Sequence, residues 1–254
     1  MIAALLALAA AAPPACGAPP LADGPRPWAT GERTTYDLDL LGAVRAGTLE
    51  LSVEPPVASG QVIPLRARAR TDASVAAFKR VVAVSYSWVD ARTLLPERFR
   101  EEASEDGTHK LSDARMARGE PELVLQHESG RQRSTRRVAR QGAALDAVSG
   151  LFLLRAAKLT PGERYCFDLV ARGRVWRIQG GVAARTEKVD TPVGRLETVR
   201  VDGTAVAADG PDEKPAEIHL WISTDPRRLL VAVVAVIDAG PVRAMLTGVD
   251  RPQR

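Results

Sequence analysis

The chain has 254 residues, of which 45% are hydrophobic and 26% are charged, and 35 Lys and Arg against 31 Asp and Glu give a net charge of +4. These proportions are typical of a folded globular protein and exclude a disordered chain. No apolar run approaches the ~18 residues of a membrane-spanning helix. The 4 Trp, 3 Tyr and 4 Phe are too few for the aromatic girdles of an outer-membrane barrel.

The first 16 residues form an uninterrupted apolar segment that ends in Cys16. Such a segment followed by small residues is typical of a secretory signal peptide. The usual positive residues are missing before it, which favours a start codon further upstream. Two routes of processing remain open. Either Cys16 becomes the acylated N-terminus of a lipoprotein, with the outer membrane as its expected location, or ordinary signal peptidase releases the protein into the periplasm.

Residues 17–31 contain four Pro and three Gly and predict an extended tether of up to ~45 Å. Trp28 is expected to cover the first strand of the domain, in preference to contacting lipid headgroups. If Cys16 is acylated, Cys166 has no partner and is expected to be a small buried hydrophobic residue. A disulfide framework and a thiolate metal site are therefore not expected.

Residues 32–254 show no break in composition and predict a single domain with a dominant period of two. Arg66, Arg68 and Arg70 alternate with Leu65, Ala67 and Ala69, which is typical of a strand with one solvated face. A strand is also expected over residues 80–90. Turn signals recur along the chain and divide it into roughly a dozen strands, for example Glu105-Asp106-Gly107, Ser129-Gly130 and Arg172-Gly173. We expect one antiparallel curved sheet, closed as a barrel or open as a half-barrel.

Two segments depart from this period. Residues 146–160 begin with a helix N-cap residue, Asp146, and stop at Pro161-Gly162, which predicts one central helix. Its apolar residues cover more than a narrow stripe, so the concave side of the sheet is expected to cover it. Leu229–Ile237 is apolar without alternation and predicts a strand that is buried on both faces.

Common catalytic and cofactor motifs are missing. The sequence shows no phosphate loop, dinucleotide fingerprint or nucleophile elbow, and its three histidines are widely separated. We therefore expect no metal, no cofactor and no enzymatic activity. Four neighbouring carboxylates suit a solvated hairpin tip better than acid–base catalysis: Glu101, Glu102, Glu105 and Asp106.

Two further groups have both a structural and a functional interpretation. Glu217, His219 and Trp221 share one strand face, either as a cross-strand polar pair with a packed Trp or as a site for a sugar or lipid headgroup. A basic run forms either a solvated face or a contact with an anionic envelope surface through Arg131, Arg133, Arg136, Arg137 and Arg140. No aromatic residues are interleaved with these arginines, so nucleic acid is not expected as a partner.

Several short motifs together resemble a family of secreted bacterial envelope proteins known as domain of unknown function 3108. They are Gly31–Tyr36, Ala46-Gly47, Trp88–Asp90, Leu95–Phe99, Asp146–Arg155 with Pro161-Gly162, Thr191–Gly194, and Leu220–Ser223 with Asp225. The family often has Pro where this chain has Leu230. The resemblance implies an extracytoplasmic, mainly antiparallel β domain and carries over no catalytic residue.

These observations favour a non-enzymatic envelope protein that holds a lipid or glycolipid in the curved sheet. The long apolar strand and the apolar helix supply more apolar lining than a thin sheet needs. The residues expected to contact the ligand are Tyr86, Trp88, Phe152, Trp221 and Val233. The alternatives are an assembly scaffold without a ligand cavity and, third, a hydrolase that acts on an envelope polymer.

Overall fold

The computed structural model describes residues 17–40, 44–140, 142–208, 214–237 and 240–252. The strands are β1 (Arg33–Leu40), β2 (Val44–Val53), β3 (Val62–Thr71), β4 (Val81–Asp90), β5 (Pro96–Glu105), β6 (Thr108–Arg115), β7 (Glu122–Ser129), β8 (Gln132–Ala139), β9 (Ala144–Asp146), β10 (Arg164–Ala171), β11 (Arg174–Thr191), β12 (Gly194–Ala207), β13 (Ala216–Ser223), β14 (Leu230–Ile237) and β15 (Gly240–Asp250). The helices are α1 (Ala73–Ala76), α2 (Ala147–Ala156) and a 3₁₀ turn, η1 (Ala58–Gly60).

All 15 strands belong to one sheet in the order β8-β7-β6-β5-β4-β3-β2-β1-β15-β14-β13-β12-β11-β10-β9. Each strand therefore pairs with its neighbours in sequence, except that β1 pairs with β15 and that β8 and β9 form the two edges of the sheet. The pairs are antiparallel apart from β9, which runs parallel to β10. The prediction of a mainly β protein with one curved sheet and a central helix is confirmed. The strand count exceeds the expected dozen partly because the three-residue β9 is too short to show an alternating pattern.

Hairpin turns explain much of this simple order. Asp106 and Gly107, with φ of 49° and 82°, connect β5 to β6. Arg172 and Gly173, with φ of 53° and 69°, connect β10 to β11. Two residues of positive φ in succession match the right-handed twist of the flanking strands. The turn signals in the sequence thus place these hairpins correctly.

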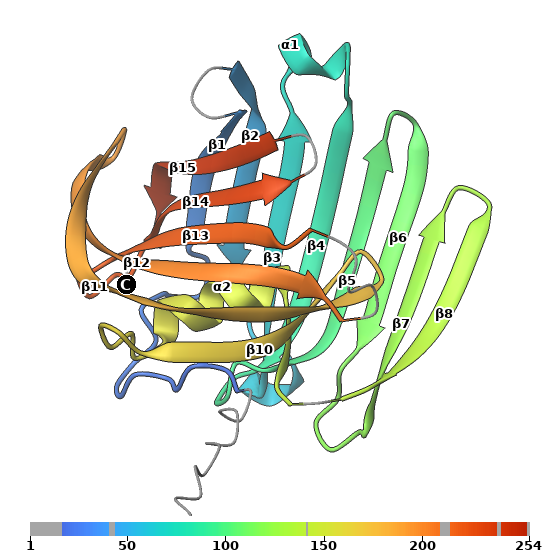
Figure 1. Cartoon of the computed structure of the whole chain (residues 1–254), viewed down its shortest axis with the longest axis horizontal. Helices are drawn as coiled ribbons and strands as arrows, with labels where there is room; N and C mark the ends of the chain where they lie inside the picture. Colours follow the sequence, from blue (N-terminus) through green and yellow to red (C-terminus); the bar gives the residue numbers. More distant parts are fainter. Residues whose placement is uncertain (1–16, 41–43, 141, 209–213, 238–239, 253–254) are drawn as a thin grey trace, which may run out of the picture.

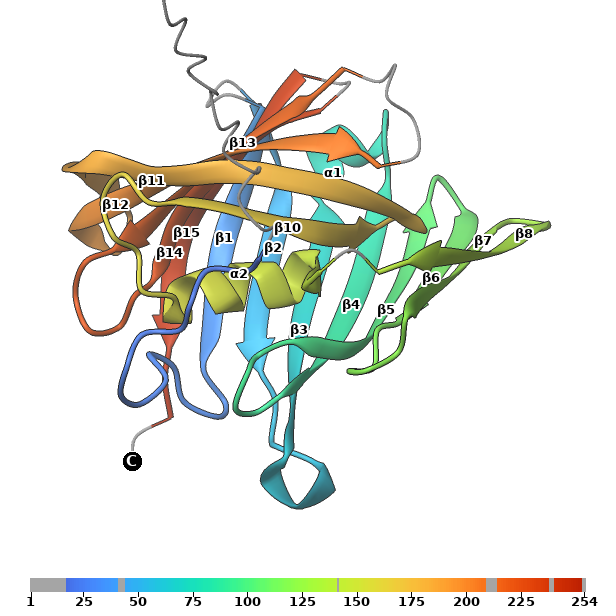
Figure 2. The ribbon, with the colours of Figure 1, turned by 60° about the horizontal axis from the view of Figure 1, so that its bottom comes forward.

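The sheet curves around α2, which crosses its concave face (Figures 1 and 2). The β10–β11 hairpin reaches the far end of the sheet, where its turn packs against β7. A Cβ atom on Gly173 would lie 2.7 Å from the Cβ of His127, so the hairpin approaches β7 at a distance that only Gly permits. The two ends of the sheet therefore meet through side chains, and the result resembles a barrel.

The helix α2 begins with a capping box. The Asp146 carboxylate accepts hydrogen bonds from the backbone N–H groups of Val148 and Ser149, both at 2.9 Å, and the Ser149 hydroxyl accepts one from the Asp146 N–H. The helix ends at Ala156, four residues before the predicted end. Ala157 is extended, with ψ of 150°, and bridges to Leu21 of the N-terminal segment. A tertiary contact therefore stops the helix before the Pro-Gly signal does.

The Pro-rich residues 17–31 pack on the domain and do not form the free tether that their composition predicts. Ala22 donates a backbone hydrogen bond to Ala156 at 2.8 Å, and the Lys158 N–H donates to Pro20 at 2.8 Å. Trp28 is buried in the hydrophobic core, where its ring meets Phe152 edge-on with the centroids 5.2 Å apart. The segment thus forms an additional wall beside α2.

The apolar run of residues 229–237, which contains β14, is buried for only about half of its length. Leu229 to Ala232 are buried, whereas Val233 to Ala235 are half-buried and Val236 is 38% exposed. The prediction of a strand buried on both faces is therefore wrong for its second half.

Cys166 also differs from expectation, because it is disulfide-bonded and half-buried on β10. The sequence contains only two cysteines. The predicted lipidation site, Cys16, and the predicted signal segment 1–16 lie outside the described residues. The residue that follows Cys16 is described: the Gly17 carbonyl accepts a hydrogen bond from the Cys166 N–H at 3.4 Å.

Candidate functional site

The five residues predicted to bind a ligand are divided between the two faces of the sheet. Two lie on the concave side. Phe152 points from α2 into the core and is 1% exposed, and Val233 on β14 stands opposite the buried Leu220 of β13. The other three lie on the outer face: Tyr86, Trp88 and Trp221. The structure thus does not bring the five together.

Strand β4 shows why the aromatic residues face outward. Successive side chains of a strand point to opposite faces. The Ser87 hydroxyl donates to the Asp146 carboxylate beneath α2, so Tyr86 and Trp88 point away from the helix. Their rings stack with centroids 5.7 Å apart, and the Arg98 guanidinium lies 5.6 Å from the Trp88 ring. The sequence pattern identifies the shared face correctly but does not say which face is inside.

Trp221 belongs to a polar row on the outer face of β13. Its indole N–H donates to Glu187 at 2.7 Å. His219, two residues earlier, lies 2.6 Å from an Asp202 oxygen of the neighbouring strand and 3.7 Å from Glu217. These contacts are the cross-strand polar pairs of the structural interpretation.

A buried ion cluster lies where α2 crosses β1. The Arg155 guanidinium is 1% exposed and donates to the Glu32 carboxylate at 2.7 Å and to the Arg228 carbonyl at 2.9 Å. Arg251 lies 2.7 Å from the other Glu32 oxygen. Tyr36, on the same face of β1, is fully buried, and this burial raises the pKa of its hydroxyl to about 12. The inner side of the sheet therefore contains a polar cluster besides its apolar core.

Beside this cluster, at the C-terminal end of α2, lies a cavity of about 350 Å³. Three segments form its walls: Ala22–Pro27 without Gly24, Arg155–Leu159, and the turn that holds Pro226 and Arg228. The prolines, alanines and Leu159 give it apolar walls. Sequence patterns do not reveal this cavity, because the composition of residues 17–31 predicts a tether; Trp28 is the one signal in them for a packed segment.

Arg228 closes the end of the helix. Its guanidinium donates to the carbonyls of Arg155, at 3.3 Å, and Ala157, at 3.1 Å. These carbonyls belong to the last turn of α2 and the residue after it, where helical partners are missing. Burial lowers the pKa of Arg228, with Asp225 acting in the opposite direction. Arg228 also has a positive φ of 46°.

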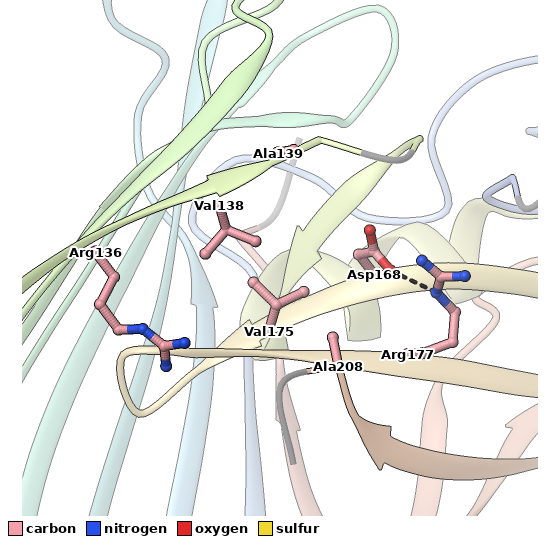
Figure 3. A pocket seen from close by; sticks show the side chains of 7 residues that line it. All are labelled: Arg136, Val138, Ala139, Asp168, Val175, Arg177 and Ala208. Atoms are coloured by element: carbon pink, nitrogen blue, oxygen red, sulfur yellow. Dashed lines mark hydrogen bonds and ion pairs between the residues drawn. The ribbon is translucent and has the colours of Figure 1, made fainter. Parts of the chain in front are cut away.

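A second cavity, of about 100 Å³, lies where β8 approaches β11 (Figure 3). Val138 of β8 faces Val175 of β11, and an ion pair between Asp168 and Arg177 at 2.6 Å forms another part of the wall. This cavity has room for a few water molecules only. We therefore take the larger cavity as the candidate ligand site.

The predicted carboxylate cluster lies on β5 and its turn. Glu105 accepts from Lys110 at 2.6 Å, and this bond is the main cause that lowers the pKa of Glu105. Hydrogen bonds from the Arg80 N–H and Lys79 lower the pKa of Asp106. Lowered pKa values keep these carboxylates ionised, which is the opposite of what a general acid needs at neutral pH.

The arginine run forms β8, one edge of the sheet, together with the turn before it and the residue after it. Arg133 and Arg137 pair with Glu128 and Glu122 on β7, at 3.4 and 3.3 Å. Arg140 donates to the Met116 carbonyl at 2.6 Å. Arg136 lies on the other face of the strand, as the alternation predicts, whereas Arg131 is exposed in the turn. Contact of these arginines with an anionic surface stays a prediction.

Within the described ranges, no group of three or more His, Cys, Asp or Glu side chains is arranged to hold a metal ion. No helix in these ranges combines the length and the apolar character needed to cross a membrane.

One curved sheet that encloses a helix defines a β-barrel-like protein. The chain belongs to the family described as protein of unknown function DUF3108, whose model matches residues 35–247. Comparison with the curated proteins gives no significant match.

One solved structure with a TM-score above 0.5 supports the fold. A β-barrel-like protein of the domain of unknown function DUF1849 from Brucella abortus matches with a TM-score of 0.59 and 15% identity, over 89% of this chain and 100% of that one. A candidate lipoprotein from Parabacteroides distasonis has a TM-score of 0.36 and 7% identity, over 88% and 97% of the two chains. A candidate exported protein with a YmcC-like fold from Bacteroides fragilis has a TM-score of 0.32 and 11% identity, over 89% and 98%.

Proposed function

We propose that this chain is a non-enzymatic protein of the bacterial cell envelope that binds one end of an amphipathic molecule, a lipid or glycolipid. The binding site is the cavity between residues 22–27 and the end of α2, in place of the concave-face site predicted from the sequence. One observation carries the proposal: the cavity holds about 350 Å³, inside the ~300–1,000 Å³ range of ligand sites, and combines apolar walls with charged groups.

Blocking this cavity is expected to abolish binding. Ala22 is exposed and lines the cavity, and only its backbone forms the hydrogen bond to Ala156. In Ala22→Trp the indole would occupy the cavity without removing that bond. Native mass spectrometry of protein purified from the bacterial envelope is expected to show a bound amphiphile in the parent chain and none in Ala22→Trp.

Ala184→Trp is the matched control, because Ala184 is exposed on β11 and does not line the cavity. It is expected to retain the bound mass. Consistently empty parent protein would contradict the ligand proposal and favour a scaffold. Equal occupancy in all three proteins would show that the amphiphile binds outside this cavity.

The envelope location draws support from the apolar N-terminal segment and from Cys166, since disulfides persist in oxidising compartments. Acylation and disulfide formation compete for the same sulfur. A disulfide within one chain requires the only other cysteine, Cys16, and an acylated Cys16 leaves Cys166 without that partner. The bonded state of Cys166 therefore counts against a lipid anchor on Cys16, and the disulfide persists in the mature protein only if signal peptidase cuts before Cys16.

We expect a maleimide to label Cys166 in unfolded protein only after reduction, and to label it without reductant in Cys16→Ser. The labelled peptide is identified by mass spectrometry. A parent protein that stays with the membrane fraction, carries a lipid on Cys16 and labels at Cys166 without reductant would show the anchor instead.

A further inference from the structure

The candidate cavity contains cationic groups that no carboxylate neutralises, and this inference rests on the ligand site proposed above. Arg26, Lys158 and Arg228 all line it. Within the part of the chain that the structure describes, none of the three forms an ion pair. Most other buried or half-buried arginines in the fold have such a partner, as Arg66 has in Glu50 and Glu54.

Neutral groups hold two of these cations in place. Arg26 donates to the carbonyls of Ala91 and Arg92. Arg228 donates to two carbonyls at the end of α2, as described above. Carbonyl oxygens satisfy hydrogen bonds but leave the net charge in place. Lys158 is exposed, and its position is fixed by the backbone bond to Pro20.

The neighbouring charged groups do not change this balance. Arg155 also lines the cavity, but it is bound to Glu32. Asp23 is the one carboxylate among the lining residues and is exposed at the rim, where it opposes an incoming anion. Asp225, which lies in the same turn as Arg228, is bound by Arg227 at 2.8 Å. Three cations against one exposed carboxylate leave the site positive.

We propose that the cavity recognises a phosphate-bearing amphiphile, with the phosphate at Arg26, Lys158 and Arg228 and the apolar part against the proline and leucine walls. Guanidinium groups match phosphate oxygens with paired N–H donors, and a charged acceptor strengthens each hydrogen bond. An alkyl phosphate thus meets both kinds of wall at once. Inorganic phosphate can interact only with the cationic groups of the cavity, and a neutral alkyl glycoside has no charge to pair with them and packs its alkyl chain against the apolar walls.

The test measures binding of octyl phosphate, octyl glucoside and inorganic phosphate by isothermal titration calorimetry, below the micelle concentrations of the two amphiphiles. Octyl phosphate is expected to bind more tightly than either of the others. Lys158→Met is expected to lower the affinity for octyl phosphate by roughly fivefold, because an exposed ion pair contributes up to about 1 kcal/mol. Raising the salt concentration is also expected to lower the affinity for octyl phosphate, because salt screens the attraction between the phosphate and the cations.

Lys188→Met is the matched control, because Lys188 is exposed on β11 and away from the cavity; it is expected to bind like the parent chain. Equal binding of octyl glucoside and octyl phosphate, or no effect of Lys158→Met, overturns the phosphate inference and leaves the amphiphile site standing. If inorganic phosphate binds as tightly as octyl phosphate, the cations recognise phosphate as proposed, but the proposal that the ligand is an amphiphile is overturned. Failure of all three ligands to bind overturns both.

Discussion

Replacing Arg155 by Met is expected to lower the free energy of unfolding by about 3–5 kcal/mol. The guanidinium is 1% exposed, donates to the Glu32 carboxylate, and lies 5.3 Å from the Trp28 ring and 5.4 Å from the Phe152 ring. Its removal leaves a carboxylate that is 1% exposed with one partner, Arg251. Urea unfolding followed by circular dichroism measures the loss.

A double variant separates the buried charge from the lost packing. Arg155→Met with Glu32→Gln is expected to lose less stability than Arg155→Met alone, because a neutral amide then replaces the buried carboxylate that has lost its Arg155 partner. Arg251→Met is expected to lose less than about 1 kcal/mol, since the Arg251 side chain is 34% exposed. If Arg155→Met unfolds at the same urea concentration as the parent chain, the ion cluster does not stabilise the fold. Strict additivity in the double variant would show that the two groups are not coupled.

The second large effect concerns Asp146, whose buried carboxylate makes stability depend on pH. Burial raises its pKa from 3.8 to about 6, against the opposing effect of the hydrogen bonds from Ser87 and the helix N-terminus. The folded state therefore binds the proton more tightly than the unfolded state does. This contribution to stability is fully present below pH ~4 and is lost as the pH rises through 6, a difference of roughly 3 kcal/mol.

Two substitutions at this position are expected to have different effects on the free energy of unfolding. Asp146→Asn retains an oxygen for the Val148 and Ser149 N–H groups and cannot ionise, so its stability should equal or exceed that of the parent chain at pH 7.5. Asp146→Ala removes the cap, leaves both N–H groups buried without an acceptor, and should cost about 2–3 kcal/mol at pH 5.

The measurement is the difference in unfolding free energy between the parent chain and Asp146→Asn from pH 4 to pH 8, with Asp190→Asn as the exposed control. We expect the difference to shift in favour of Asn as the pH rises from 4 to about 6 and to level off above that, and the control to show no such trend. A difference that is constant across this range would mean that Asp146 does not titrate with a raised pKa.

Local patterns in the sequence are enough to predict most of the fold. Alternation in residues 65–70, the turn residues Asp106-Gly107 and the N-cap Asp146 each act over a few residues, so each is readable without tertiary information. The end of α2 is not readable in this way, because the contact between Ala157 and Leu21 spans 136 positions and depends on where the N-terminal segment docks.

The site was harder to predict for a related reason. Period-two alternation shows that Tyr86 and Trp88 share a face, but the identity of the inner face depends on what covers it. Here the covering element carries a carboxylate, so Ser87 faces inward and the aromatic rings face outward. The cavity itself is built from three segments that are distant in sequence, and no local motif marks such a junction.

The arginine-bearing edge strand β8 has a consequence for self-association. An unpaired strand edge offers backbone N–H and carbonyl groups to a second chain, and like charges on that edge oppose the approach of an identical copy. The repulsion weakens wherever a polyanion binds the guanidinium groups. A phosphate-rich polymer would therefore make this protein more prone to edge-to-edge oligomers, whereas dilute buffer of low ionic strength would keep it monomeric.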